Sequence, residues 1–203
     1  STVYNTTASI NKRAGILLNS TINSSLSEIV SFSNDEGNGI QIESSLNTTL
    51  TDITLSNHSE YGLVIYYSNY STIRNVTASY NAASGFDLEG QFDEITEVNC
   101  SYNLHNGISL LSTYYSNLTN ITVSNNSEYG VYLRDARNNY LAGIYSSQNG
   151  LGSIGEERSY NSIIINLTNI NNSGYDVNST NGGVITDGNV ESYIFDNATL
   201  EII

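Results

Sequence analysis

The sequence has 203 residues, with 20 acidic and 6 basic side chains and a formal net charge of −14. So few basic residues argue against nucleic acid as a partner, because its phosphates require a basic surface, and against an anionic membrane surface. No apolar run approaches the ~18 residues that a membrane-spanning helix needs, so we expect no membrane insertion. The single cysteine, Cys100, excludes an internal disulfide.

A glycine followed by alternating apolar residues recurs along the chain every 22 to 24 residues. These glycines are Gly15, Gly39, Gly62, Gly85, Gly107 and Gly130. With the glycine counted as position 1, apolar side chains recur at positions 2, 4, 12 and 15 of each unit. Cys100 falls at position 17, in one column with Leu55, Ala78 and Val123, and is expected to be a small core residue. The alternation of apolar and polar residues predicts short strands rather than helices.

In chain order, this frame divides one domain, residues 1–203, into three parts. Residues 1–14 align with the second half of a later unit, since "TVYNTTASINKRAG" matches "TIRNVTASYNAASG" at 72–85. Residues 15–198 hold eight units of about 23 residues, which we call rungs. Residues 199–203, "TLEII", fit the first strand of a further rung. The two terminal pieces are therefore expected to be complementary halves of one rung.

Such rungs can bury their apolar positions only by stacking, which predicts an all-β, single-domain β-solenoid with aliphatic columns inside. The Gly-hydrophobic-X-hydrophobic units and the segments "NVTASYN" and "NITVSNN" resemble the right-handed parallel β-helix repeat family. That family includes pectin-lyase-like enzymes, NosD-type periplasmic proteins and archaeal surface proteins. The resemblance covers essentially the whole chain and implies a right-handed parallel β-helix. It leaves the function open, because this fold hosts several activities.

Polygalacturonase- and pectate-lyase-like members of the family cut acidic sugars with clustered Asp, assisted by basic residues and often by Ca²⁺. The densest acidic segment here is "FDLEGQFDEITE" at 86–97, in which Asp87 and Glu89 share an outward face and could hold Ca²⁺ through oxygen ligands. Adjacent rungs add no acids at these positions, so a solvated face is the preferred interpretation. We therefore predict no catalytic residues and no metal ligands.

NosD-type relatives are associated with copper, and the resemblance therefore raises the question of a copper site. The two histidines, His58 and His105, lie two rungs apart, which corresponds to ~10 Å at the usual strand spacing. That separation is too large for one metal ion, and the chain has no methionine. No cofactor is predicted.

The motif Asn-X-Ser/Thr occurs more often than the composition explains, which favours a glycosylated protein at the cell surface or outside the cell. The alternative is that the motif recurs only because the chain is repetitive. The candidate N-glycosylation sites are Asn5, Asn19, Asn23, Asn47, Asn69, Asn75, Asn99, Asn117, Asn120, Asn166, Asn178 and Asn197.

The complementary ends predict that subunits stack head to tail and share a rung, which builds a filament unless the contact closes into a ring. The residues expected to make this contact are Val3, Thr6, Ala8, Leu200 and Ile202. The preferred hypothesis is therefore a non-enzymatic extracellular structural protein that forms a filament, sheath or surface layer. The alternative is a carbohydrate-binding or polysaccharide-cleaving β-helix protein, in which outward tyrosines such as Tyr66, Tyr70 and Tyr132 could stack on sugars.

Overall fold

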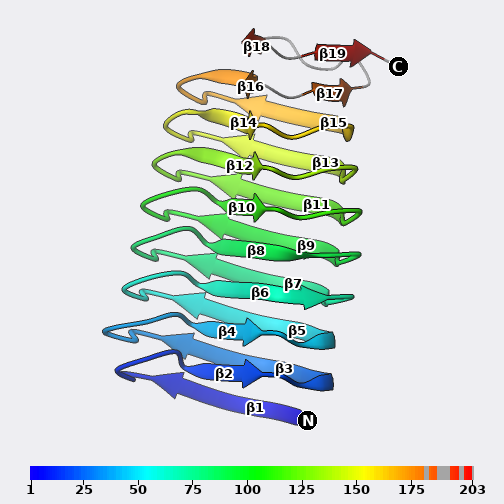
Figure 1. The fold of residues 1–203 in the computed structure, drawn as a ribbon. Helices are drawn as coiled ribbons and strands as arrows, with labels where there is room; N and C mark the ends of the chain where they lie inside the picture. The colour runs from blue at the N-terminus through cyan, green and yellow to red at the C-terminus, as the bar shows by residue number, and fades with distance from the viewer. Residues whose placement is uncertain (181–182, 187–192, 197–198, 203) are drawn as a thin grey trace.

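The computed structural model describes residues 1–180, 183–186, 193–196 and 199–202, with side chains for residues 1–180. Its strands stack in two columns and pair in parallel throughout (Figure 1). The first column contains β2 (Ile16–Asn19), β4 (Ile40–Glu43), β6 (Leu63–Asn69), β8 (Phe86–Gln91), β10 (Ile108–Leu111), β12 (Tyr129–Arg134), β14 (Gly152–Glu157), β16 (Tyr175–Thr180) and β18 (Tyr193–Asp196). The second column contains β1 (Thr2–Ser9), β3 (Ile22–Phe32), β5 (Leu46–Ser56), β7 (Thr72–Ser79), β9 (Glu94–Ser101), β11 (Asn117–Ser124), β13 (Tyr140–Ser147), β15 (Ser162–Ile170), β17 (Gly183–Thr186) and β19 (Thr199–Ile202).

The core consists of aliphatic columns that run through the stack, as the 23-residue period predicts. Like positions pair across successive rungs, for example Leu50 with Ile73, and both side chains are fully buried. Cys100 pairs with Ala78 on one side and Val123 on the other and is also fully buried, which raises the pKa of its thiol. The predicted parallel β-solenoid and the core placement of Cys100 are confirmed.

One corner of the solenoid is held by a column of polar side chains, which we call the asparagine ladder. In each of these rungs a side-chain acceptor, an oxygen in all but one, bonds the backbone N–H of the ladder residue in the preceding rung. In most rungs it also bonds that residue's side-chain amide. Its members are Asn34, His58, Asn81, Asn103, Asn126, Asn149 and Asn172. These bonds satisfy buried N–H groups that the curved backbone cannot pair in the strands.

His58 occupies the ladder position that asparagine fills in the other rungs. Nδ1 of His58 accepts the N–H of Asn34 at 3.3 Å, so its proton lies on Nε2, which donates to the Ser31 carbonyl at 3.1 Å. Burial lowers the pKa of His58 to about 4, although the bond to Ser31 opposes this shift. A neutral imidazole therefore replaces an amide in this rung.

The two ends of the chain do not supply complementary half-rungs. Val3, Thr6 and Ala8 lie in β1, which pairs with β3, and the C-terminal strand β19 pairs with β17. The pairing of Gly183 with Thr199 also spans fewer residues than the 23-residue period. Both terminal strands thus belong to the second column, and the expected first-column placement of Leu200 and Ile202 is wrong.

Candidate functional site

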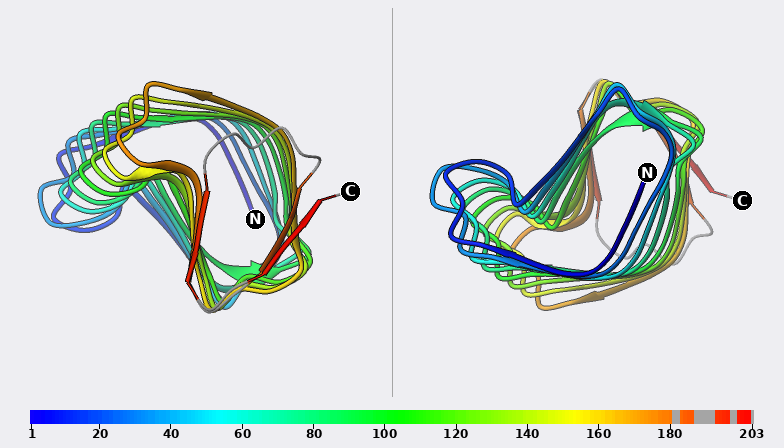
Figure 2. Two further views of the ribbon diagram at one scale, coloured as in Figure 1. Left: turned by 90° about the horizontal axis from the view of Figure 1, so that it is seen from above. Right: turned by 90° about the horizontal axis from the view of Figure 1, so that it is seen from below.

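One face of the solenoid is sheltered by the loops that precede the first-column strands. The cross-section is bent, with these loops projecting at one side (Figure 2). Asn106 in one such loop donates to the Ser109 hydroxyl at 3.2 Å, and Ser84 lies 3.2 Å from the same hydroxyl. We call this sheltered column the concave face; it consists of Gln41, Val64, Asp87, Ser109, Tyr132, Gly155 and Asn178.

Asp87 is buried on the concave face, so the expected solvated position is wrong. Only 2% of its surface is exposed, because the loop and Tyr66 cover it. The Tyr66 hydroxyl donates to Oδ2 of Asp87 at 3.4 Å, whereas Oδ1 has no hydrogen-bond partner among the described residues. Burial raises the pKa of Asp87, against the opposing effects of the Tyr61 and Tyr66 hydroxyls and the charge of Arg134.

Glu89 follows Asp87 on the same strand face and is partly exposed. It lines a surface hollow of about 470 Å³ together with Tyr67, Asn69, Gly90, Gln91, Ser112 and Tyr114. Burial is the largest factor raising the pKa of Tyr66, and the charges of Asp87 and Glu89 raise it further. Strands β6 and β8 thus place a buried carboxyl, a phenol and an accessible carboxyl close together, and each of these groups can carry a proton.

The rest of the acidic segment has other roles. Asp93 is buried at a corner, where its Oδ1 accepts the N–H of Ser71 at 2.7 Å, and burial raises its pKa to about 7. Glu97 pairs with Arg74 at 3.1 Å on the surface. Within the part of the chain that the structure describes, no three His, Cys, Asp or Glu side chains are grouped as metal ligands. Among the described residues, Asp87 and Glu89 are therefore joined by no third acidic, histidine or cysteine side chain that could bind Ca²⁺ with them.

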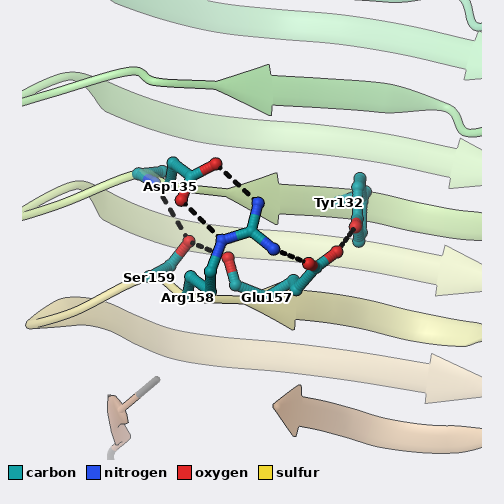
Figure 3. A network of polar contacts seen from close by, with 6 residues as sticks. Tyr132, Asp135, Glu157, Arg158 and Ser159 are labelled. Carbon is teal, nitrogen blue, oxygen red and sulfur yellow. Dashed lines mark hydrogen bonds and ion pairs between the residues drawn. The ribbon is translucent and has the colours of Figure 1, made fainter. Parts of the chain in front are cut away.

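A second hollow, of about 260 Å³, lies on the concave face around Gly155. Tyr129, Tyr132, Glu156, Glu157, Asn178 and Thr180 line it. Figure 3 shows the polar contacts at its edge, where Tyr132 donates to Glu157 at 2.7 Å and Arg158 joins Glu157 to Asp135. The sequence did not lead us to predict this hollow. Gly155, at a position that carries a side chain in the other rungs, could have indicated it.

The remaining predicted residues are spread over the surface. His58 is buried in the ladder, and His105 lies 3.5 Å from Glu128 at an exposed position. Tyr70 and Tyr115 stack on opposite faces of Phe92, so these rings bind one another. Of the candidate glycosylation sites, Asn197 lies outside the described residues and Asn69, Asn117 and Asn178 are partly buried. The others are exposed: Asn5, Asn19, Asn23, Asn47, Asn75, Asn99, Asn120 and Asn166.

A family model described as "Right handed beta helix region" matches residues 1–117. The chain therefore belongs to this family, which confirms the resemblance inferred from the repeats. No curated protein matches the sequence. No helix in the described part of the chain is long and apolar enough to cross a bilayer.

Several solved structures share the fold. A variant of the periplasmic alginate epimerase AlgG has a TM-score of 0.78 at 12% identity, over 90% of this chain and 60% of that one. The A-module of the Azotobacter vinelandii mannuronan C-5 epimerase AlgE6 has a TM-score of 0.65 at 13% identity, over 88% and 63%. The enzymatically active domain of bacteriophage CBA120 tailspike protein 2 has a TM-score of 0.67 at 10% identity, over 89% and 36%. The chain thus spans less than two thirds of each of these structures.

These findings overturn the expectation of a non-enzymatic, filament-forming structural protein. The similar structures are enzymes, two of which are named for polysaccharide substrates. At this level of identity the likeness establishes the fold alone.

Proposed function

We propose that this protein is a polysaccharide-active enzyme that binds a glycan along its concave face and acts by proton transfer. Glu89 is the accessible acid or base, and Tyr66 is a second proton-transfer group. Asp87 is a positioning residue that holds the Tyr66 hydroxyl. The observation that carries the proposal is the buried Asp87, bonded to Tyr66 beside the accessible Glu89.

The site has the features that acid–base chemistry on a sugar requires. A carboxyl that is partly exposed can reach a substrate, whereas a buried carboxyl can fix its neighbour and tune the neighbour's proton affinity. The hollow beside Glu89 has polar and aromatic walls, which suit a sugar ring with its hydroxyl groups and apolar C–H face. Enzymes named for alginate and mannuronan among the similar structures support a polysaccharide as the substrate class.

The proposal includes a location outside the cytoplasm, in the periplasm or at the cell surface. A periplasmic enzyme among the similar structures supports this location. N-glycosylation also stays a prediction, supported by the exposure of Asn5, Asn75, Asn120 and Asn166. Mass spectrometry of the protein from its native source tests it, and unmodified peptides at all exposed sites would contradict it.

The activity is tested by incubating the protein with alginate, polygalacturonate, galactan and glucomannan. New reducing ends, unsaturated ends and changes in sugar configuration are the three readouts. Glu89→Gln should lower the rate on the active polymer by ~10²–10⁴-fold, the usual contribution of a general acid or base. Asp87→Asn should also lower the rate and shift the pH profile, because it alters the proton affinity of Tyr66.

Glu97→Gln is the matched control, since Glu97 is an exposed carboxylate paired with Arg74 away from the concave face. It should retain the wild-type rate. Full activity in both Glu89→Gln and Asp87→Asn would show that the site is elsewhere. No reaction with any of the four polymers would count against the proposed function.

A further inference from the structure

Gly155 interrupts the side chains of the concave face. In register, the column continues from Ser109 to Tyr132, Gly155 and Asn178. A Cβ atom on Gly155 would lie 2.6 Å from Cδ2 of Tyr129, so only glycine lets the Tyr129 ring lie over the strand. The Tyr129 ring that lies over Gly155 also lines the hollow of about 260 Å³, which we call the Gly155 pocket.

Two aromatic rings form one wall of the Gly155 pocket. The Tyr129 and Tyr132 rings stack at a centroid distance of 5.8 Å and an interplanar angle of 11°. Nδ2 of Asn178 donates to the Tyr129 hydroxyl at 2.9 Å, which fixes this ring from the far side of the gap. The pocket therefore has a preformed aromatic surface, to which the apolar face of a sugar can pack.

Carboxylate groups form the polar edge of the pocket. Glu157 accepts the Tyr132 hydroxyl at 2.7 Å and is held from the other side by Arg158 (Figure 3). Arg158 also binds Asp135 through two nitrogen atoms at 2.8 Å, so its guanidinium is engaged by two carboxylates. The lining contains two glutamates and no basic residue.

Glu156 is a buried acid beside the pocket, in the inward column that pairs with Leu133 and Ser179. It lines the pocket although only 3% of its surface is exposed. Ser179 donates to Oε2 at 2.7 Å, whereas Oε1 has no hydrogen-bond partner among the described residues. A buried polar atom without a partner is costly, which favours the protonated, uncharged carboxyl at this position.

We propose that the Gly155 pocket binds one neutral sugar ring of a glycan that lies along the concave face. The tyrosines pack against the ring, and Glu157, Asn178 and Thr180 bond to its hydroxyls. A sugar carboxylate is disfavoured, because it would meet the Glu157 carboxylate with no basic residue in the lining. This inference rests on the proposed function, of which it specifies the substrate class.

The pocket lies at a distance from Asp87 that a glycan can bridge. Asp87, Ser109, Tyr132 and Gly155 pair in successive rungs, which places Gly155 about 14 Å from Asp87 at the usual strand spacing. An oligosaccharide spans this length, whereas a single ring does not. The pocket is therefore a separate subsite, which recognises a sugar of the polymer other than the one that reacts.

Binding is tested by saturation-transfer NMR without any need for turnover. The neutral probes are the methyl glycosides of glucose, galactose and mannose, and the anionic probes are glucuronate and mannuronate. Wild-type protein should bind a neutral probe and not the anionic ones. Gly155→Ala should weaken binding on the order of tenfold by displacing Tyr129, and Glu157→Gln should weaken it similarly by removing a charge-assisted acceptor.

Tyr129→Phe provides a second variant that keeps the ring and the fold and removes only the hydroxyl that Asn178 holds. It should weaken binding by a smaller factor, whereas the surface control Glu97→Gln should bind as wild type. Unchanged binding in all three pocket variants, preference for the anionic probes or no binding of any neutral probe would overturn the inference.

The outcomes also separate this inference from the proposed function. Sugar binding that is lost in Gly155→Ala, without turnover of any polymer, would support the subsite and count against the reaction. Turnover that depends on Glu89 but not on Gly155, Tyr129 or Glu157 would support the reaction and overturn the subsite.

Discussion

The asparagine ladder and the concave face each contribute one residue per rung, yet they differ in how much they vary. Six of the seven ladder residues are asparagine, with His58 as the exception. The seven residues of the concave face are all of different types. The ladder meets the same need in every rung, an acceptor for a buried N–H, whereas stacking imposes no such rule on the outer face. The difference separates the residues that specify the fold from those free to specify a ligand.

The largest effect on stability is expected when the ladder is broken at its centre. Asn103→Ala leaves the N–H and the side-chain amide of Asn81 without their acceptor and removes the donor to Asn126. Several buried polar groups then lack partners, so the free energy of unfolding should fall by about 4 kcal/mol. Urea unfolding measures this loss. Asn99→Ala, at an exposed strand position, should change the stability by less than about 0.5 kcal/mol.

The free energy of unfolding should fall at high pH because Glu156, beside the Gly155 pocket, is buried. Burial raises the pKa of Glu156 from 4.5 to about 8, so the folded state resists the ionisation that the unfolded state undergoes freely. This stability is fully present below pH 4.5 and is lost as the pH rises towards about 8, by on the order of 3 kcal/mol. Urea unfolding of Glu156→Gln and wild type between pH 5 and 9 isolates the contribution. A constant difference across this range would contradict the assigned environment of Glu156.

The contribution of the asparagine ladder to stability should fall in acid, because one of its members is His58 rather than asparagine. His58 has a folded pKa of about 4, below its ordinary 6.5, because burial disfavours the imidazolium and Nδ1 must accept the N–H of Asn34. Its contribution is present above pH 6.5 and is lost as the pH falls towards 4, by on the order of 2 kcal/mol. His58→Asn restores the ladder amide, so the variant should lose stability less steeply than wild type over this range.

The effect of His58 is measured as the difference in stability between His58→Asn and wild type, because other groups also titrate in acid. Asp87, Asp93 and Glu156 have raised pKa values and stabilise the fold in the same acid range, against the effect of His58. The groups that bond to the His58 ring and backbone, from Asn34, Ser31 and Asn81, carry no charge. Parallel pH profiles for His58→Asn and wild type would show that His58 is not the sensitive group.

The core could be predicted from the sequence because stacking demands an apolar residue at the same position in every rung. This is why the period placed Leu50, Ile73 and Cys100 correctly. The burial of Asp87 could not be predicted, since it depends on loops that fold back without any apolar period. The pairing of β19 with β17 was missed because the spacing of paired residues shortens there, and a fixed period then assigns the wrong column.

The smallest effect on stability should come from a change on the concave face, where the effect on function should be large. Tyr66→Phe removes a hydroxyl whose bond to Asp87 is long, at 3.4 Å, and keeps the ring that shelters the carboxyl. The free energy of unfolding should therefore change by less than about 1 kcal/mol. The rate on the active polysaccharide should fall by ~10²-fold or more, because a proton-transfer group is lost. Equal rates in Tyr66→Phe and wild type would mean that Tyr66 does not serve the reaction. The residues of the concave face would then differ from rung to rung only because stacking does not constrain them.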